Sequence, residues 1–421
     1  MAVTERPADV VGIDLGTTHC AAAFVEGASI AAGEPVVQSF PIPQLVREGE
    51  LEERPVLPSC VYLAREGELP PGSLALPWEP PAADEAVGTL ALELGGRVPG
   101  RLVTSAKSWL CHAQVDRTQA ILPWGGSGER RLSPVEASAR YLDHVRRAWN
   151  HARAAADPAA RLEAQEVVLT VPASFDEAAR ELTVAAARAA GLEHVTLLEE
   201  PQAALYAWIH RGRGAWQDEV RPDQVLLVVD VGGGTTDLSL VRVGQAGDGK
   251  PTLERFAVGR HLMLGGDNMD LALAHLVEAK LGGGGLDAGR WQHLVQRCRA
   301  AKETLLAGGA ERVRIEVLGA GSSVIGGTRT AELERGEVDR LIVDGFAPEV
   351  GLDEPLREAE QGGLQELGLP YEADPAITRH LAAFLRAHGG SERPGEPGGP
   401  GEPGGPVRPD AVLFNLSLIH I

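Results

Sequence analysis

Two segments that lie far apart in the chain carry the same short pattern at the end of an apolar run. Residues 14–18 read DLGTT and residues 230–237 read DVGGGTTD, and each follows a stretch of strand-forming residues. In the common glycine-rich nucleotide loops, a helix follows the glycines. Here the residues that follow, 20–25 and 238–243, continue with a second strand pattern. The sequence therefore predicts two similar β-hairpins with glycine-rich tips.

The residue types in these tips are those that bind a polyphosphate and its metal ion. Glycine lets backbone amides converge on an anion, and threonine hydroxyls add short hydrogen-bond donors. The aspartates Asp14 and Asp230 end the two strands, where their carboxylates can hold the water shell of Mg²⁺. The alternative for each hairpin alone is an ordinary glycine turn. The predicted phosphate-binding residues are Gly16, Thr17, Thr18, Gly232, Gly233, Gly234 and Thr235.

The charge balance argues against several classes of partner. The chain has 39 basic and 59 acidic residues and only 4% aromatic residues, so we expect no nucleic-acid binding. It has no apolar run of membrane-spanning length and no basic segment followed by an apolar run at its start, so we expect neither a membrane span nor a signal peptide. The four cysteines form no CxxC pair, which favours reduced thiols in a cytoplasmic protein. The histidines His19, His112 and His144 lack metal-ligand spacing and are expected to be surface or core histidines that bind no metal.

The rest of the sequence alternates strand and helix patterns, as expected of an α/β fold. Ser133 and Ser174 each stand three residues before a glutamate, the spacing of a capping box at a helix start. Residues 66–100 are rich in Pro, Gly, Ala and Glu and are expected to be irregular, and the GEPGGP repeat at 395–406 predicts a solvated linker. We expect strands at 10–13, 20–25, 166–171, 195–198, 224–229, 238–243 and 411–414, and helices from Ser133, Ser174 and Pro201 and over 269–281 and 290–306.

An ordered series of short motifs resembles the DnaK-type seventy-kilodalton heat-shock chaperones of the actin-like ATPase superfamily. The motifs are GIDLGTT at 12–18, LPS at 57–59, AK at 106–107, TVPASF at 170–175, EPQAA at 200–204, DVGGGTTD at 230–237 and LGGD at 264–267. The resemblance implies an actin-like ATPase fold, with two lobes that each carry a sheet flanked by helices around a nucleotide cleft. It also implies ATP and Mg²⁺ as ligands. We expect lobe I at 1–215, lobe II at 216–390, a Pro/Gly linker at 391–408 and the start of a truncated strand segment at 409–421.

The resemblance assigns roles to individual residues. It implies that Lys107, Glu200, Asp230 and Thr235 are catalytic, that Gly265, Gly266 and Lys302 add nucleotide contacts, and that Asp14 and Asp230 hold the metal through water. Pro172 and Arg180 match the family's proline switch and its coupled arginine. Each role has a simpler alternative, because Lys107 could be a surface lysine, Glu200 a helix cap and Pro172 a strand terminator.

Three positions depart from the family pattern in the helix that would contact adenosine. Arg299, Glu303 and Leu306 replace the Glu, Arg and Ser that the family carries there. The family's third glycine pair, expected after the strand at 411–414, is replaced by LSLIHI. We therefore expect this chain, as a C-terminally truncated nucleotide-binding domain without a peptide-binding domain, to bind Mg-ATP weakly and to discriminate poorly between adenine and guanine.

The leading interpretation is the ATP-binding and hydrolysing domain of a divergent DnaK-like chaperone, with closure of the lobes driven by nucleotide. Expected partners are ATP and ADP, with co-chaperones and unfolded clients in a longer form. Two alternatives from the same superfamily remain at this point, a small-molecule kinase and a non-enzymatic actin-like filament subunit. The motifs at 170–175 and 200–204 favour the chaperone interpretation over the kinase.

Overall fold

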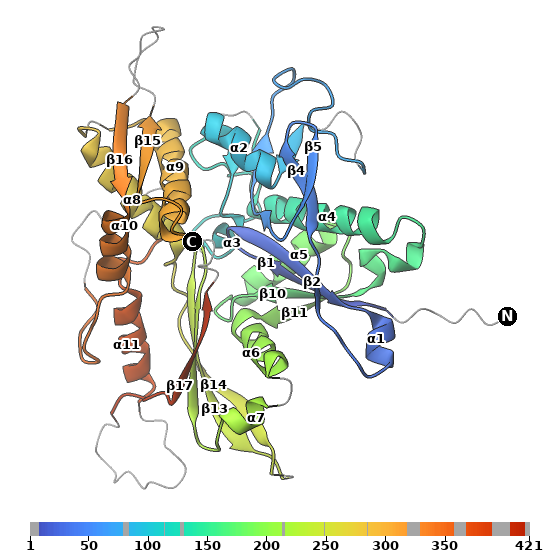
Figure 1. Ribbon diagram of the computed structural model, residues 1–421, viewed down its shortest axis with the longest axis vertical. Coiled ribbons are helices and arrows are strands. Elements are labelled where there is room, and N and C mark those ends of the chain that lie inside the picture. Colours follow the sequence, from blue (N-terminus) through green and yellow to red (C-terminus); the bar gives the residue numbers. More distant parts are fainter. Residues whose placement is uncertain are drawn as a thin grey trace, which may run out of the picture.

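The computed structural model has an α/β architecture built on two main sheets (Figure 1). It describes residues 8–78, 84–112, 114–126, 130–212, 215–247, 249–283, 285–317, 329–357, 368–389 and 405–416. The blue and green N-terminal half of the chain forms one side of the molecule, and the orange and brown helices of the C-terminal half form the other. The actin-like fold class expected from the sequence is confirmed.

The first sheet contains the first glycine hairpin and has the strand order β11-β10-β1-β2-β3. Strand β1 (Val10–Leu15) pairs antiparallel with β2 (His19–Val25), as the sequence predicted, and parallel with β10 (Glu166–Val171). Helix α4 (Pro134–Arg153) packs beside α5 (Glu177–Ala189), and Val145 and Trp149 of α4 are fully buried. The sheet is completed by β3 (Gln38–Ser39), β6 (Leu57–Pro58) and β11 (Val195–Glu199).

The second sheet contains the second glycine hairpin and has the order β14-β13-β12-β17. Strands β12 (Val225–Val231) and β13 (Thr236–Gln245) form the hairpin, β14 (Pro251–Val258) pairs with β13, and β17 (Ala411–Leu416) runs parallel to β12. Helix α6 (Glu200–Arg211) covers one face and α11 (Ile377–Ala387) the other. Both faces of β13 are therefore covered, and its residues 236–241 are all buried.

The remaining elements lie outside the two main sheets. Helices α8 (Gly266–Lys280) and α9 (Ala288–Leu306), both predicted, pack against each other, and α9 contacts β15. The other described α-helices and β-strands are α1 (Gly27–Ala31), β4 (Ile42–Arg47), β5 (Glu50–Arg54), β7 (Val61–Leu63), β8 (Glu85–Val87), α2 (Thr89–Arg97), β9 (Leu102–Val103), α3 (Ala106–Leu110), α7 (Trp216–Glu219), β15 (Arg312–Val317), β16 (Arg329–Glu334) and α10 (Arg335–Arg340).

The segment 66–100 is more regular than its composition predicts. It contains strand β8 and helix α2, while its residues 79–83 lie outside the described residues. Leu90, Ala91 and Leu94 of α2 are buried in a cluster of their own with Tyr62. Their spacing of three and four residues forms one apolar helix face, and this packing overrides the high glycine and proline content of the segment.

The two predicted helix starts differ in outcome. Ser133 caps α4 as expected, because its Oγ accepts from Glu136 N at 3.1 Å and the Glu136 carboxylate accepts from Ser133 N at 2.8 Å. For α5 the cap is Asp176, whose carboxylate accepts from Ala179 N at 2.7 Å, so the predicted Ser174 cap is wrong. Ser174 instead contacts the second hairpin, where its hydroxyl donates to Asp237.

The strand predicted at 411–414 forms, and much of its surface is exposed. Val412 is 46% exposed and Phe414 is 61% exposed, because β17 is an edge strand and the core beneath α11 is built on β12 and β13. Most of the predicted linker, residues 391–404, lies outside the described residues, as do residues 417–421.

Buried His144 makes the stability of the fold sensitive to mild acid. Burial lowers its pKa to about 4, while its Nε2–H donates to the Pro43 carbonyl at 2.9 Å. The unfolded chain binds this proton near pH 6.5, so the unfolded state gains protons first as the pH falls. The stabilisation is therefore complete above pH 6.5 and is lost between pH 6.5 and 4, by up to about 3 kcal/mol.

Urea unfolding at pH 7 and pH 4.5 measures this loss. The variant His144→Gln keeps an Nε2–H donor toward Pro43 but cannot titrate, so its unfolding free energy should fall less between the two pH values. Equal losses in the variant and the parent protein would contradict the assignment.

Candidate functional site

The tips of the two glycine hairpins lie on one cavity of about 320 Å³. Asp14 and Asp230 both line it, as expected of hairpins that face one another. The walls come from both sheets, from α3 and from α6. The lining residues that carry polar or glycine chemistry are Asp14, Gly16, Thr17, Thr18, His19, Lys107, Thr170, Glu200, Asp230, Gly232, Gly233, Thr235 and Asn415.

The glycines allow the two tips to approach each other closely. A Cβ on Gly16 would lie 2.2 Å from the His19 carbonyl oxygen, and one on Gly233 would lie 2.2 Å from Thr18 Cγ2. A Cβ on Gly234 would lie 2.4 Å from Ser108 Oγ. Gly16 is thus required by its own turn, Gly233 by contact with the other hairpin and Gly234 by contact with α3. Gly234 is not among the residues that line the cavity.

Lys107 is a buried cation in the wall of this cavity. It lies on α3, and its ammonium forms an ion pair with Glu200 at the start of α6. Burial lowers the pKa of Lys107, but the carboxylates of Glu200, Asp14 and Asp230 outweigh burial and hold this pKa above its usual value. The simpler alternative of a surface lysine is therefore wrong, and the side chain is protonated at neutral pH.

Glu200 does not act as a helix cap. The N-cap position of α6 is Glu199, and its side chain makes no capping hydrogen bond. Burial raises the pKa of Glu200 above its usual value, with Lys107 opposing the rise and Asp14 adding to it. Its carboxylate points toward Lys107, so it belongs to the cavity.

Each hairpin aspartate accepts a hydrogen bond from the strand beside it. Thr170 Oγ1 on β10 donates to Asp14 Oδ1 at 2.7 Å, and Asn415 Nδ2 on β17 donates to Asp230 Oδ1 at 3.1 Å. The other oxygen of Asp230, Oδ2, is buried and has no hydrogen-bond partner among the described residues. That oxygen therefore remains available to a group bound in the cavity.

The cavity has more acidic than basic charge. Burial raises the pKa of Asp230 well above its usual value, and Glu200, Asp237 and Asp14 raise it further. Lys107 is the one basic side chain of Lys or Arg type among the described residues that line the cavity. This surplus favours a bound cation, which would neutralise the carboxylates.

The groups fit a magnesium ion held through water. No three His, Cys, Asp or Glu side chains in the described part of the chain lie close enough to hold a metal directly. Asp14 and Asp230 reach the cavity from opposite hairpins, and the unpartnered Asp230 Oδ2 is an acceptor for a metal-bound water.

Two of the predicted glycines lie at the start of α8, which contacts the second hairpin outside the cavity. Gly265 is the N-cap residue of α8, and Gly266 is the first residue of that helix. The amide of Gly266 donates to the Gly232 carbonyl at 3.2 Å and that of Asp267 to the Gly233 carbonyl at 2.7 Å. The start of α8 therefore holds the glycine turn in place, and neither Gly265 nor Gly266 lines the cavity.

Lys302 lies in a buried ion cluster and not on the cavity wall. Its Nζ is 2.6 Å from Asp270 Oδ1, and both side chains are almost completely buried. Arg299 Nε is 2.7 Å from Asp270 Oδ2, and its guanidinium also pairs with Asp267. In this arrangement Lys302 is engaged by Asp270, so the predicted ribose contact would require that ion pair to open.

A larger cleft of about 880 Å³ adjoins the cavity and shares Thr17, Thr18 and His19 with it. Arg299 and Glu303 of α9 line this cleft, whereas Leu306 does not. Two of the three departures in α9 therefore face the space next to the first glycine hairpin. A ligand that extended from the hairpins into this cleft would meet a guanidinium at position 299 and a carboxylate at position 303, the reverse of the family's pattern.

Arg180 forms hydrogen bonds with the segment that follows Pro172. Its guanidinium donates to the carbonyls of Phe175 and Ala173, at 3.2 and 3.3 Å, and to Glu199 at 2.9 Å. Arg180 therefore contacts the backbone one and three residues after Pro172. The role of Pro172 and Arg180 as a switch stays a prediction.

Sequence reasoning missed Thr170 and Asn415 as residues of the site. Thr170 is the first residue of the TVPASF motif, and Asn415 is the polar residue that follows the apolar run AVLF. Asn415 follows the apolar strand pattern AVLF just as Asp230 follows the apolar strand pattern before it. This similarity could have indicated that the two side chains lie together at the ends of neighbouring strands.

Comparison with known proteins decides the family. The sequence model for the family described as Hsp70 protein matches residues 97–355, more than half of the chain. The chain belongs to the Hsp70 family. It is 31% identical over 345 residues to the chaperone protein HscA homolog of Acidithiobacillus ferrooxidans, which covers 79% of this chain and 46% of that protein. It is 33% identical over 306 residues to the HscA homolog of Azotobacter vinelandii, 71% of this chain and 42% of that one.

Membership of the Hsp70 family confirms the resemblance drawn from the ordered motifs. The chain spans about half the length of the curated relatives it matches. Proteins of this family are ATPases that bind nucleotide with magnesium. No helix in the described parts of the chain is long and apolar enough to cross a membrane.

Proposed function

We propose that this chain binds ATP with Mg²⁺ between its two glycine hairpins and hydrolyses it, as the nucleotide-binding domain of a DnaK-like chaperone. The observation that carries the proposal is the convergence of Asp14, Lys107, Glu200 and Asp230 on one cavity with both hairpin tips. Phosphoryl transfer to water depends mostly on positioning and charge neutralisation, which this set of groups supplies.

The proposed division of labour follows from the chemistry of each group. The backbone amides of the two tips and the hydroxyls of Thr17, Thr18 and Thr235 would bind phosphate oxygens. Lys107 would stabilise the negative charge that develops on the transferred phosphate. Asp14 and Asp230 would hold Mg²⁺ through its water shell, and the ion would neutralise phosphate charge. Glu200 keeps Lys107 in place, and Asp230 offers a free oxygen to the attacking water.

The wider role is proposed from family membership. The two sides of the molecule, residues 1–215 and 216–390, would close on nucleotide as lobes I and II. The hydrogen bonds of Ser174 to Asp237 and His261 would change with that movement, because they join the loop between β10 and α5 on one side to β13 and the loop after β14 on the other. Co-chaperones and unfolded clients would be partners of a longer protein in the cytoplasm.

Titration calorimetry and a hydrolysis assay test the proposal together. We expect ATP to bind with Mg²⁺ and to be hydrolysed to ADP and free phosphate at the same rate with or without a sugar acceptor. Because Arg299 and Glu303 line the adjoining cleft, we expect the affinities for ATP and GTP to differ by less than about tenfold.

Three outcomes would contradict the proposal. If ATP did not bind in Mg²⁺-containing buffer, the proposed nucleotide site would be wrong. Phosphate transfer to the acceptor would favour the kinase alternative, and light scattering that rises on adding ATP would favour a filament subunit.

A further inference from the structure

The two hairpin aspartates are held in the same way by different side chains. Strands β1 and β12 each have a parallel neighbour, β10 and β17, on the side away from their hairpin partner. Thr170 follows the paired residues Ile13 and Leu169 and donates to Asp14, and Asn415 is paired with Asp230 and donates to it. In both cases the donor stands at the matching register position of the neighbouring strand.

The hydrogen bond from Asn415 places the two oxygens of Asp230 in different situations. Oδ1 accepts from Asn415 Nδ2, so it is occupied from the side of the sheet. Oδ2 has no hydrogen-bond partner among the described residues, and the side chain lines the cavity. A single donor on one oxygen restricts rotation of the carboxylate and leaves the other oxygen directed to the bound ligand.

The charges around Asp230 make such a donor necessary. Glu200, Asp237 and Asp14 all repel the carboxylate, and the side chain is only 4% exposed, so water cannot replace a lost donor freely. Lys107 is already paired with Glu200. A carboxylate without Asn415 would be free to rotate away from the cavity to relieve this repulsion.

We infer that Asn415 is a positioning residue that holds Asp230 for the magnesium-bound nucleotide, as the counterpart of Thr170 on the other hairpin. The inference rests on the proposed function, because it assigns a task to Asn415 only if the cavity takes Mg-ATP. A purely structural role, as a bond that ends strand β17, is the competing explanation.

Three variants separate the two explanations. Asn415→Leu removes the donor at similar volume. Asn415→Thr supplies a hydroxyl donor, the group that Thr170 uses toward Asp14. Phe414→Leu is the control on the same strand, because Phe414 is 61% exposed and does not line the cavity. Urea unfolding of each variant checks that the sheet is intact.

We expect Asn415→Leu to lower kcat for ATP hydrolysis by about tenfold with a change in KM below about threefold. Asn415→Thr should recover most of the loss, and Phe414→Leu should match the parent. Calorimetry of ADP binding at increasing Mg²⁺ gives a readout without turnover, and there Asn415→Leu should need several-fold more Mg²⁺ for the same affinity.

Parent-like kcat and parent-like Mg²⁺ dependence in Asn415→Leu would overturn the inference. So would an equal defect in a stably folded Asn415→Thr, because a donor would then not be what matters. If the parent protein binds Mg-ADP but hydrolyses no ATP, the proposed hydrolysis is wrong, and the Mg²⁺ titration still decides the role of Asn415.

Discussion

Replacing Lys107 by alanine is expected to lower the rate of ATP hydrolysis by about 100-fold or more. The ammonium is buried, protonated and paired with Glu200 in the wall of the cavity that both hairpins line. A preorganised positive charge in such a site stabilises charge that develops during phosphoryl transfer. ATP binding should weaken much less, because the backbone amides of the hairpins remain. Single-turnover hydrolysis and calorimetry measure the two effects separately.

Two further variants make this result specific. Lys107→Met keeps the apolar stem and should show the same loss, whereas Lys280→Ala removes a lysine that pairs with Glu337 away from the cavity and should leave hydrolysis unchanged. Unchanged turnover in a folded Lys107→Ala variant would return Lys107 to a structural role as the partner of Glu200.

The second large effect concerns stability. Asp270→Ala is expected to lower the free energy of unfolding by about 3–5 kcal/mol. Asp270 is fully buried and pairs with Lys302 at 2.6 Å and with Arg299 at 2.7 Å. Its removal leaves Lys302 buried without a carboxylate partner and leaves Arg299 with Asp267 alone. Urea unfolding followed by tryptophan fluorescence measures the loss.

An exposed ion pair provides the matched control. Glu50→Ala removes the partner of Arg47 on the surface hairpin β4–β5, where both side chains are well exposed, and should cost less than about 1 kcal/mol. If Asp270→Ala were no more destabilising than Glu50→Ala, the buried cluster would not contribute as its geometry indicates.

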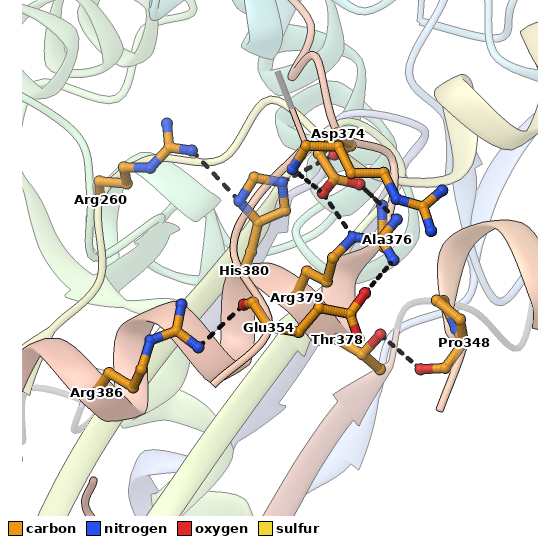
Figure 2. A network of polar contacts seen from close by, with 10 residues as sticks. Arg260, Pro348, Glu354, Asp374, Ala376, Thr378, Arg379, His380 and Arg386 are labelled. Atoms are coloured by element: carbon orange, nitrogen blue, oxygen red, sulfur yellow. Dashed lines mark hydrogen bonds and ion pairs between the residues drawn. The ribbon is translucent and has the colours of Figure 1, made fainter. Parts of the chain in front are cut away.

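The polar network around Asp374 shows how such buried pairs hold a segment without regular secondary structure in place (Figure 2). Arg379 on α11 makes two bonds to the Asp374 carboxylate, at 2.6 and 2.9 Å, and the amides of Arg357 and Ala376 donate to the same group. These bonds and the coulombic attraction of Arg379 hold the pKa of Asp374 at about 2 although burial opposes them. His380 and Arg260 extend the network toward the second sheet.

Features that depend on a few neighbouring residues could be predicted from the sequence. The glycine hairpins follow from apolar runs interrupted by residues that tolerate tight turns, and the cap at Ser133 follows from its spacing to Glu136. The order of the motifs was specific enough to identify the family. The start of α5 could not be assigned in this way, because Ser174 and Asp176 are both good caps and Ser174 is used by the other sheet.

The sequence by itself determined the two hairpins, the residue types at their tips and the family, because these depend on local backbone preferences and on the order of short motifs. Only the tertiary structure decided which partner each charged or polar side chain takes. Lys107 faces the cavity with Glu200, Lys302 is turned to Asp270, and Asn415 reaches Asp230 from a strand 185 residues further along the chain. Such pairings follow from the packing of distant elements, which brings a donor and an acceptor together where water cannot replace either of them.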